Sequence, residues 1–266
     1  MLTSKPLLAS ISGALLATTS ANAQDLMHHW DFDDTGMPGG TLTVFDQAGS
    51  ADATAIGTPD ISIHATYGEA YVGAGQSLNT VLTGITAGGG HLEAEVHDGV
   101  NATGMDFGTA DWSYSYWSYN EDDGDIRGPR VVDNLHSDLS QGIQHATAAA
   151  NEFNLRIDGD AGVSYKTNDA LTILQGTGSW IHVVVNVDRG AGMCAVYFDN
   201  VLQGMSALTD ASGTLPLTGG IYPSQDMLIG AINFANNASS VQAAGLDDLA
   251  FYSGLLDASD RAGLAA

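Results

Sequence analysis

Short apolar runs, separated by glycine and polar turn residues, recur along the chain from about residue 26 to its end. Within many runs apolar and polar positions alternate, which is the two-residue period of a strand with one buried face. The 3.6-residue period of an amphipathic helix is almost absent. Strands are predicted at residues 28–33, 112–119, 153–157, 180–188, 193–198, 227–229 and 246–252, with weaker ones at 61–64, 69–72, 92–96 and 142–146.

This succession of strands predicts an all-β fold. Many short strands without helices between them favour two antiparallel sheets packed face to face, as in a jelly-roll sandwich. The weakest stretch runs from Asp138 to Asn151, where Gly142 interrupts an incomplete apolar stripe, so a loop, a short helix and a poor strand all stay open. No repeat or linker divides residues 24–266, which are therefore predicted to form one domain.

The N-terminus has the pattern of a secretory signal. Lys5 precedes an apolar run at residues 6–17, and the small residues Ala21 and Ala23 frame a cleavage site. A membrane anchor is the alternative, but the run is shorter than the roughly 20 residues that a spanning helix needs, and no later segment comes close. We therefore expect residues 1–23 to be removed and the protein to be secreted, either to the cell exterior or to the periplasm.

Acidic residues dominate the charge of the chain. Its 31 Asp and Glu against 7 Lys and Arg give a formal net charge of −24, which repels nucleic acid and attracts divalent cations. A hydrophobic share of 44% with only 14% charged residues indicates a packed core and not a disordered acidic chain. The acidity serves either a binding function or adaptation to a saline medium, and both interpretations stay open.

Cys194 is the only cysteine, so the chain has no internal disulfide. It alternates with Val196 and Phe198 along a predicted strand. We expect a buried and unreactive thiol.

The strand at residues 112–119 carries aromatic side chains on both faces. Trp112, Tyr114 and Tyr116 share one face, and Trp117 and Tyr119 share the other. Either the strand is buried on both sides, or its second face is an exposed aromatic platform.

An acidic loop at residues 120–125 follows this strand directly. Carbohydrate recognition combines an apolar ring face with polar groups that bind hydroxyls, so the predicted ligand site is Trp117, Tyr119, Asp122 and Asp123. A solvated acidic loop is the alternative.

The two ends of the mature chain both have acid-bearing strands. Asp33 closes the first strand, Asp46 begins a polar turn, and Asp247 lies inside the last strand. We expect the two terminal strands to be neighbours, because separate edge strands would leave their apolar faces half exposed. Carboxylates gathered there would suit calcium, which takes six to eight oxygen ligands.

The order of several motifs gives the chain a resemblance to a known family. The motifs are Trp30 to Asp33, Gly68 to Val72, Asp111 to Trp117, Trp180 to Asp188, Val196 to Gly204, Leu228 to Gly230 and Gly245 to Asp248. In this order they resemble the laminin-G-like branch of the concanavalin A-like jelly rolls. One departure is Asn200, which stands in the turn where glycine is usual and which a left-handed turn tolerates.

The resemblance implies a protein that binds carbohydrates or other proteins outside the cell. It also implies a calcium ion near the joined termini, with Asp247 as the leading ligand and Asp33 and Asp46 supplying further oxygens. The alternative for Asp247 is that it caps a turn or accepts backbone hydrogen bonds. His182 matches a structural position of the family, and we expect it and the pair His28 and His29 to be packing residues.

No constellation of residues indicates catalysis. His91, Glu93, Glu95 and His97 would share one face of a strand, as a metal site or an acid–base pair, but an exposed polar face explains them more simply. The sequence therefore predicts a secreted, non-catalytic module that binds a glycan or another extracellular partner, with a structural calcium ion. The alternatives are a polysaccharide hydrolase or lyase with an unrecognised site, and a self-assembling matrix or surface protein.

Overall fold

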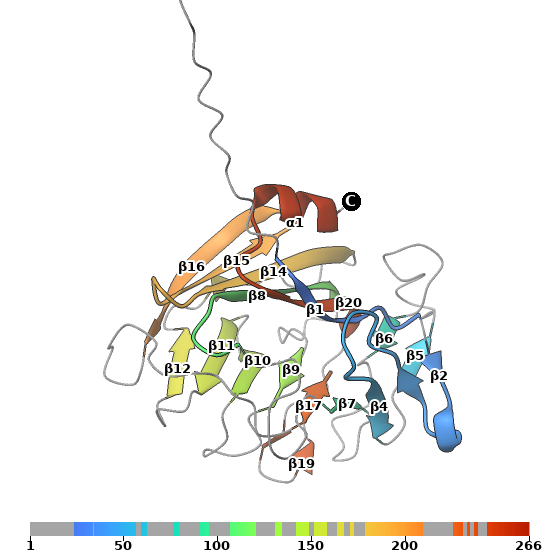
Figure 1. Cartoon of the computed structure of the whole chain (residues 1–266). Helices are drawn as coiled ribbons and strands as arrows, with labels where there is room; N and C mark the ends of the chain where they lie inside the picture. The colour runs from blue at the N-terminus through green and yellow to red at the C-terminus, as the bar shows by residue number, and fades with distance from the viewer. Residues whose placement is uncertain are drawn as a thin grey trace, which may run out of the picture.

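The protein is a two-layer β-sandwich with one short helix at its C-terminus (Figure 1). A computed structural model describes residues 24–33, 35–56, 60–62, 77–79, 91–95, 107–120, 131–134, 142–148, 152–158, 164–167, 171–172, 179–209, 226–230, 233–234, 237–238 and 244–265. All strand pairs within this part of the chain are antiparallel, as the alternating sequence predicts.

We call the upper layer in Figure 1 sheet A. Its strands are β1 (Leu26–Trp30), β5 (Asp60–Ser62), β6 (Ser77–Asn79), β8 (Trp112–Asn120), β14 (Trp180–Asp188), β15 (Met193–Phe198), β16 (Val201–Thr209) and β20 (Ala244–Ser253). From β20 the sheet runs through β8, β14 and β15 to β16.

We call the lower layer sheet B. Its strands are β2 (Thr35–Gly36), β3 (Thr43–Val44), β4 (Ala53–Ile56), β7 (His91–Ala94), β9 (Val132–Asp133), β10 (Gly142–Ala148), β11 (Glu152–Asp158), β12 (Ser164–Thr167), β13 (Leu171–Thr172) and β17 (Met227–Ile229). The end of β16 pairs with β12, which joins the two layers at one side. The remaining elements are the strand pair β18 (Asn233–Phe234) and β19 (Asn237–Ala238), the 3₁₀ turn η1 (Pro38–Gly40) and the helix α1 (Ala258–Leu264).

The terminal strands are neighbours, and this prediction is confirmed. Strand β1 pairs with the second half of β20, where Trp30 lies opposite Leu249. Strand β6 pairs with the first half of β20 on the same side, and β8 pairs with β20 on the other side. The last strand of the chain is therefore an interior strand of sheet A.

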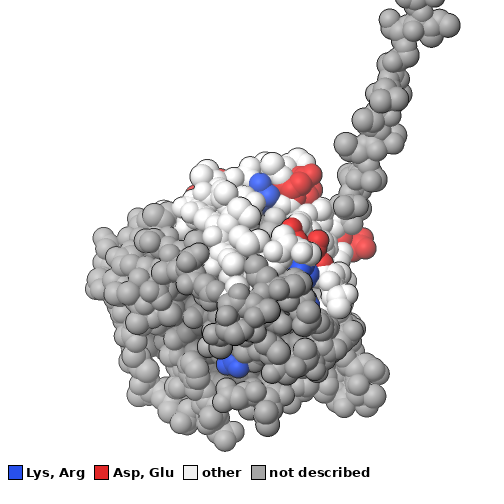
Figure 2. Space-filling view, turned by 90° about the vertical axis from the view of Figure 1, so that its left-hand side faces the viewer, with Lys and Arg blue, Asp and Glu red and all other residues white. Residues whose placement is uncertain are grey.

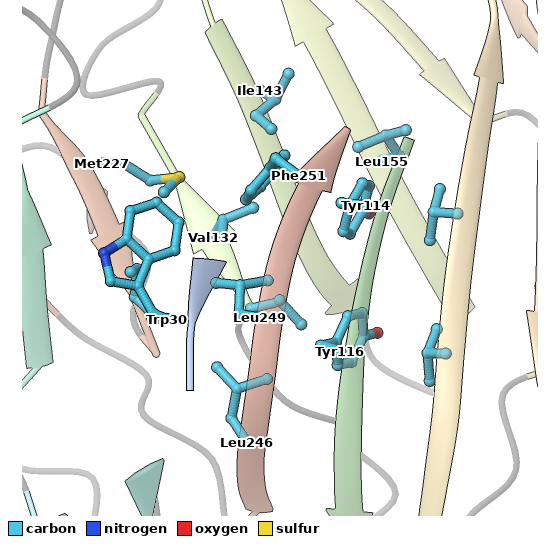
Figure 3. Packing of buried hydrophobic residues seen from close by; sticks show 14 of the residues in the cluster. Trp30, Tyr114, Tyr116, Val132, Ile143, Leu155, Met227, Leu246, Leu249 and Phe251 are labelled. Carbon is cyan, nitrogen blue, oxygen red and sulfur yellow. The ribbon is translucent and has the colours of Figure 1, made fainter. Parts of the chain in front are cut away.

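The core lies between the sheets and consists of aromatic and branched aliphatic side chains (Figure 3). Trp112, Tyr114 and Tyr116 point into it from β8, as the alternation predicts, with neighbouring rings 5.8 and 6.2 Å apart. Tyr114 also donates or accepts a 2.9 Å hydrogen bond with His145, so its buried hydroxyl has a partner. Cys194 is fully buried, and this burial raises the pKa of its thiol, in agreement with the predicted unreactive cysteine.

Strand positions follow the sequence pattern closely. The predicted ranges 180–188, 193–198 and 227–229 coincide with β14, β15 and β17, and the ambiguous stretch after Asp138 contains strand β10. The predicted strand at 69–72 lies outside the described residues. Asn200 has a left-handed φ of 62° in the turn between β15 and β16, which is the conformation expected at this glycine-like turn position.

The helix α1 was not predicted. It covers part of the outer face of sheet A. There Val184, Ala250, Tyr252 and Leu256, which precedes the helix, form a second apolar cluster, and Leu264 of the helix packs against it. Its start is fixed by a capping box, in which the side chain of Asp257 accepts from the backbone N–H of Ser259 and Asp260. With one buried residue in seven positions, the helix has too little apolar pattern to be found from its sequence.

Truncation tests the interior position of β20. A chain that ends at Gly245 should fail to fold, because β1 would lose its partner strand and β8 one of its two partners. A chain that ends at Asp257 keeps β20 and loses only α1, so it should melt cooperatively at a lower temperature. Circular dichroism melts of both chains check this, and a cooperative transition in the shorter chain would contradict it.

Candidate functional site

The outer face of sheet A brings together residues from both sequence-predicted sites. Trp117 on β8 lies between Asp247 on β20 and His182 on β14, each its direct partner in register. The proposed ligand site and the proposed metal site therefore meet at one tryptophan.

Trp117 is buried, with 2% of its surface exposed. Its ring packs on the imidazole of His182 at a centroid distance of 4.8 Å. Of the two interpretations of this strand, the structure shows burial on both sides, so Trp117 does not form an exposed platform. Alternation alone could not reveal this, because it assigns a face without showing what covers that face.

His182 is a neutral packing residue, in line with its predicted role. Burial lowers the pKa of His182 to about 4, although the nearby carboxylates of Asp248 and Asp199 act in the opposite direction. Its backbone N–H donates to the side chain of Asp199, which ties β14 to the turn before β16.

An aromatic pair lies next to Trp117 on the same face. Tyr119 of β8 and Trp180 of β14 are half-buried and meet edge to face, with ring centroids 5.6 Å apart. Gly245 of β20 allows the approach of Trp180, since a Cβ atom there would lie 2.7 Å from the indole. Trp180 was not among the predicted site residues, although it shares a face with His182 in the alternating pattern.

A polar pair lies on the other side of Trp117. His29 of β1 hydrogen-bonds through its Nε2 to Oδ1 of Asp248, and both side chains are partly exposed. Asp248 sits in a β-bulge of β20 with a φ of 54°. Burial opposes protonation of His29, but the hydrogen bond and charge of Asp248 outweigh it and raise the pKa of the imidazole.

Asp46 organises a turn and is not open to a ligand. Its Oδ1 accepts from the backbone N–H of His29, Ala48 and Gly49, and its Oδ2 accepts from Ala51 N–H and from Nδ1 of His28 at 2.6 Å. Burial of the carboxylate opposes ionisation, yet these donors outweigh it and hold the pKa of Asp46 well below its ordinary range.

The three predicted calcium ligands have different surroundings, and the calcium site stays a prediction. The lone pairs of Asp46 already accept N–H groups, Asp33 is exposed, and Asp247 is buried beside Trp117. Within the described ranges no group of three or more His, Cys, Asp or Glu side chains is arranged to hold a metal ion. Asp122 and Asp123 of the predicted ligand site lie outside the described residues.

Strand β7, which carries Glu93, has one buried apolar face and one polar face. Leu92 and Ala94 of β7 are buried in the core, while Glu93 is half-buried and Glu95 is exposed. This agrees with a polar outer face, the simpler of the two interpretations. His97 lies outside the described residues.

Comparison with solved structures shows similarity to β-sandwich binding domains. The binding domain of Paraclostridial mosquitocidal protein 1 has a TM-score of 0.60 and 12% identity, and covers 91% of this chain and 52% of that one. The binding domain of botulinum neurotoxin DC, in complex with rat synaptotagmin II, has a TM-score of 0.57 and 12% identity over 91% and 51%. This chain thus spans about half the length of these toxin domains.

A third similar structure matches from end to end. Domain 4 of an extracellular GH43 arabinanase from Geobacillus stearothermophilus, in complex with arabinotriose, has a TM-score of 0.56 and 17% identity, and covers 91% of this chain and 99% of that one. At such identities the likeness establishes the fold, and it confirms the predicted β-sandwich. No protein-family model and no curated protein sequence matches the chain, so the laminin-G-like branch stays a prediction.

No helix in the described part of the chain is long and apolar enough to cross a membrane.

Substitution of Asp46 tests its role in the turn. Asp46→Ala leaves His28 and several backbone N–H groups without their acceptor, so the free energy of unfolding should fall by roughly 2 kcal/mol. Because the folded-state pKa of Asp46 is depressed, its contribution is present above the unfolded-state pKa of about 3.9 and is lost as the pH falls below that value.

Urea unfolding of wild type and Asp46→Ala between about pH 3 and 7 measures this difference. Asp25→Ala, which changes an exposed carboxylate, is the control and should shift stability by less than about 0.5 kcal/mol. Equal effects of the two substitutions would show that Asp46 does not organise the turn.

Proposed function

We propose that this chain is an exported, non-catalytic domain that binds carbohydrate on the outer face of sheet A. The observation that carries the proposal is the half-buried pair Tyr119 and Trp180, which offers aromatic surface beside the partly exposed His29 and Asp248. Aromatic faces stack on the apolar faces of sugar rings, and a nearby imidazole and carboxylate bind hydroxyl groups.

The fold comparisons support a binding role. Two of the similar structures described above are binding domains, and the third, domain 4 of the arabinanase, was solved in complex with arabinotriose. The motif order of the laminin-G-like family and the signal pattern at residues 1–23 support placing this role outside the cell. A calcium ion held by Asp33, Asp46 and Asp247 stays a prediction from the sequence, and the proposal does not depend on it.

Loss of the aromatic pair should remove binding. Tyr119→Ala and Trp180→Ala are each expected to weaken binding of arabinotriose, or of the best ligand on an oligosaccharide panel, by about tenfold or more, because a stacking contact contributes on the order of 1 to 2 kcal/mol. Isothermal titration calorimetry measures the affinity.

Tyr197→Ala is the matched control for these variants. Tyr197 is a half-buried tyrosine on the same face, but the guanidinium of Arg261 covers its ring at 3.7 Å. This variant should keep full affinity. A wild-type protein that binds no member of the panel would overturn the proposal, and new reducing ends in the mixture would show a glycosidase instead.

Trp117 should contribute to stability and not directly to binding. Trp117→Ala is expected to lower the free energy of unfolding by about 3 to 5 kcal/mol, as truncations of buried aromatic residues do. Denaturant unfolding measures the loss. A variant of unchanged stability that no longer binds the sugar would show that the indole is a ligand platform after all.

A further inference from the structure

The proposed carbohydrate site presents a carboxylate oxygen that the protein itself does not use. His29 bonds through Nε2 to Oδ1 of Asp248, and the two side chains are 26% and 30% exposed. Within the described part of the chain neither side chain makes another hydrogen bond, so Oδ2 of Asp248 and Nδ1 of His29 are left for a ligand. A carboxylate oxygen only accepts hydrogen bonds, so the ligand group beside Asp248 must be a donor.

The backbone of β20 fixes the place of this carboxylate. The register against β8 passes from Asp247 opposite Trp117 to Ala250 opposite Ser115, so the bulge adds one residue to β20. Asp248 lies in this bulge with a φ of 54°, a left-handed conformation that aspartate and asparagine tolerate better than most residues. Bulges re-aim side chains, and this one leaves the carboxylate at the partly exposed surface.

The polar pair and the aromatic pair share one face of the sheet. Tyr119 and Trp180 are half-buried, while Trp117, which lies between the two pairs, is 2% exposed. A ligand that contacts both pairs places an apolar ring face over the aromatic side chains and a donor group at Asp248. Sugar rings with hydroxyl groups combine these two properties.

The charges around the polar pair are negative. In the part of the chain that the structure describes, the charges that act on His29 come from Asp248, Asp31 and Asp46. A protonated His29 offsets only one of these carboxylates. The nearby imidazole of His182 adds no positive charge at neutral pH, because burial lowers its pKa to about 4. An anionic ligand group therefore meets net negative charge here.

The charge of the whole chain acts in the same direction. Its formal net charge is −24, and Figure 2 shows acidic groups exposed on the described surface of one side of the molecule. This field opposes the approach of an anionic polymer. It is screened beyond about 10 Å at 0.1 M salt, so the carboxylates beside a bound ligand decide the discrimination in contact.

We propose that Asp248 makes the carbohydrate site selective for neutral sugars, whose hydroxyl groups donate to its free oxygen, and that sugars with a carboxylate are excluded. This inference rests on the proposed function. A neutral sugar offers hydroxyls that donate to Asp248 and that either donate to or accept from His29. A uronate places a charged acceptor beside a carboxylate, so neither the hydrogen bond nor the charge is satisfied.

Matched sugars test the selectivity. Arabinotriose, cellotriose and mannotriose are compared with the same oligosaccharides oxidised at their primary hydroxyls to carboxylates. In isothermal titration calorimetry the wild type should bind the oxidised form of its best ligand at least about tenfold more weakly, since like charges in contact oppose binding. Methyl esters of the oxidised sugars keep the shape without the charge, and they should recover most of the affinity.

Asp248→Asn tests the residue itself. Asparagine tolerates the left-handed φ, and its amide oxygen still accepts from His29, so the bulge and the pair should stay. The neutral ligand should bind about tenfold more weakly, because a hydrogen bond to a carboxylate is roughly twice as strong as a neutral one. The difference between neutral and oxidised sugars should shrink. Thermal melts followed by circular dichroism check that the fold is intact.

Asp25→Asn is the matched control, because it removes the same charge from an exposed aspartate. It should leave the affinity and the selectivity unchanged. An equal effect of Asp25→Asn and Asp248→Asn would show that only the overall charge matters, and it would overturn the role of Asp248.

The remaining outcomes separate this inference from the proposed function. A wild type that binds neutral and oxidised sugars equally overturns the selectivity, while carbohydrate binding stands. Tighter binding of the oxidised sugar, or an Asp248→Asn variant with the wild-type preference, also overturns it. A wild type that binds neither form overturns both proposals.

Discussion

The interior position of β20 is the constraint on which the rest of sheet A depends. This last strand bonds to β8 on one side and to β1 and β6 on the other, so the chain cannot complete the sheet until its final residues are present. The contact between His29 and Asp248 spans 219 positions in sequence. Folding that depends on such distant pairs carries a large loop-closure cost and is slow compared with the formation of local hairpins.

Two histidine–aspartate pairs fix β1 to its surroundings from opposite faces. Neighbouring residues of a strand point in opposite directions, so His28 packs on Trp30 on the core side and bonds to Asp46, while His29 faces outward and bonds to Asp248. Strand β1 therefore contacts a turn on one side and the bulge of β20 on the other. This arrangement explains why His28 belongs to the packing of the core, while His29 is part of the partly exposed site.

The sequence predicts those features that depend on local pattern. Strands β14, β15 and β17 could be placed from alternation because their side chains sort by face within a few residues. Three outcomes needed the tertiary structure. Burial of Trp117 depends on what covers the outer face, and Asp46 accepts from N–H donors of an adjacent strand and of its own turn. The indole of Trp180 packs beside Tyr119 against Gly245, where a Cβ atom would block it. An acidic residue in a polar turn has the same sequence signature whether it binds a cation or backbone N–H groups.

The outer face of sheet A has different surroundings in two regions. Val184, Ala250 and Tyr252 form an apolar cluster with Leu256, and helix α1 contributes Leu264 to its cover. The aromatic pair of Tyr119 and Trp180 and the pair of His29 and Asp248 lie outside this cluster and are only partly buried. The C-terminal segment therefore covers the apolar part of the face and leaves the region of the proposed carbohydrate site accessible.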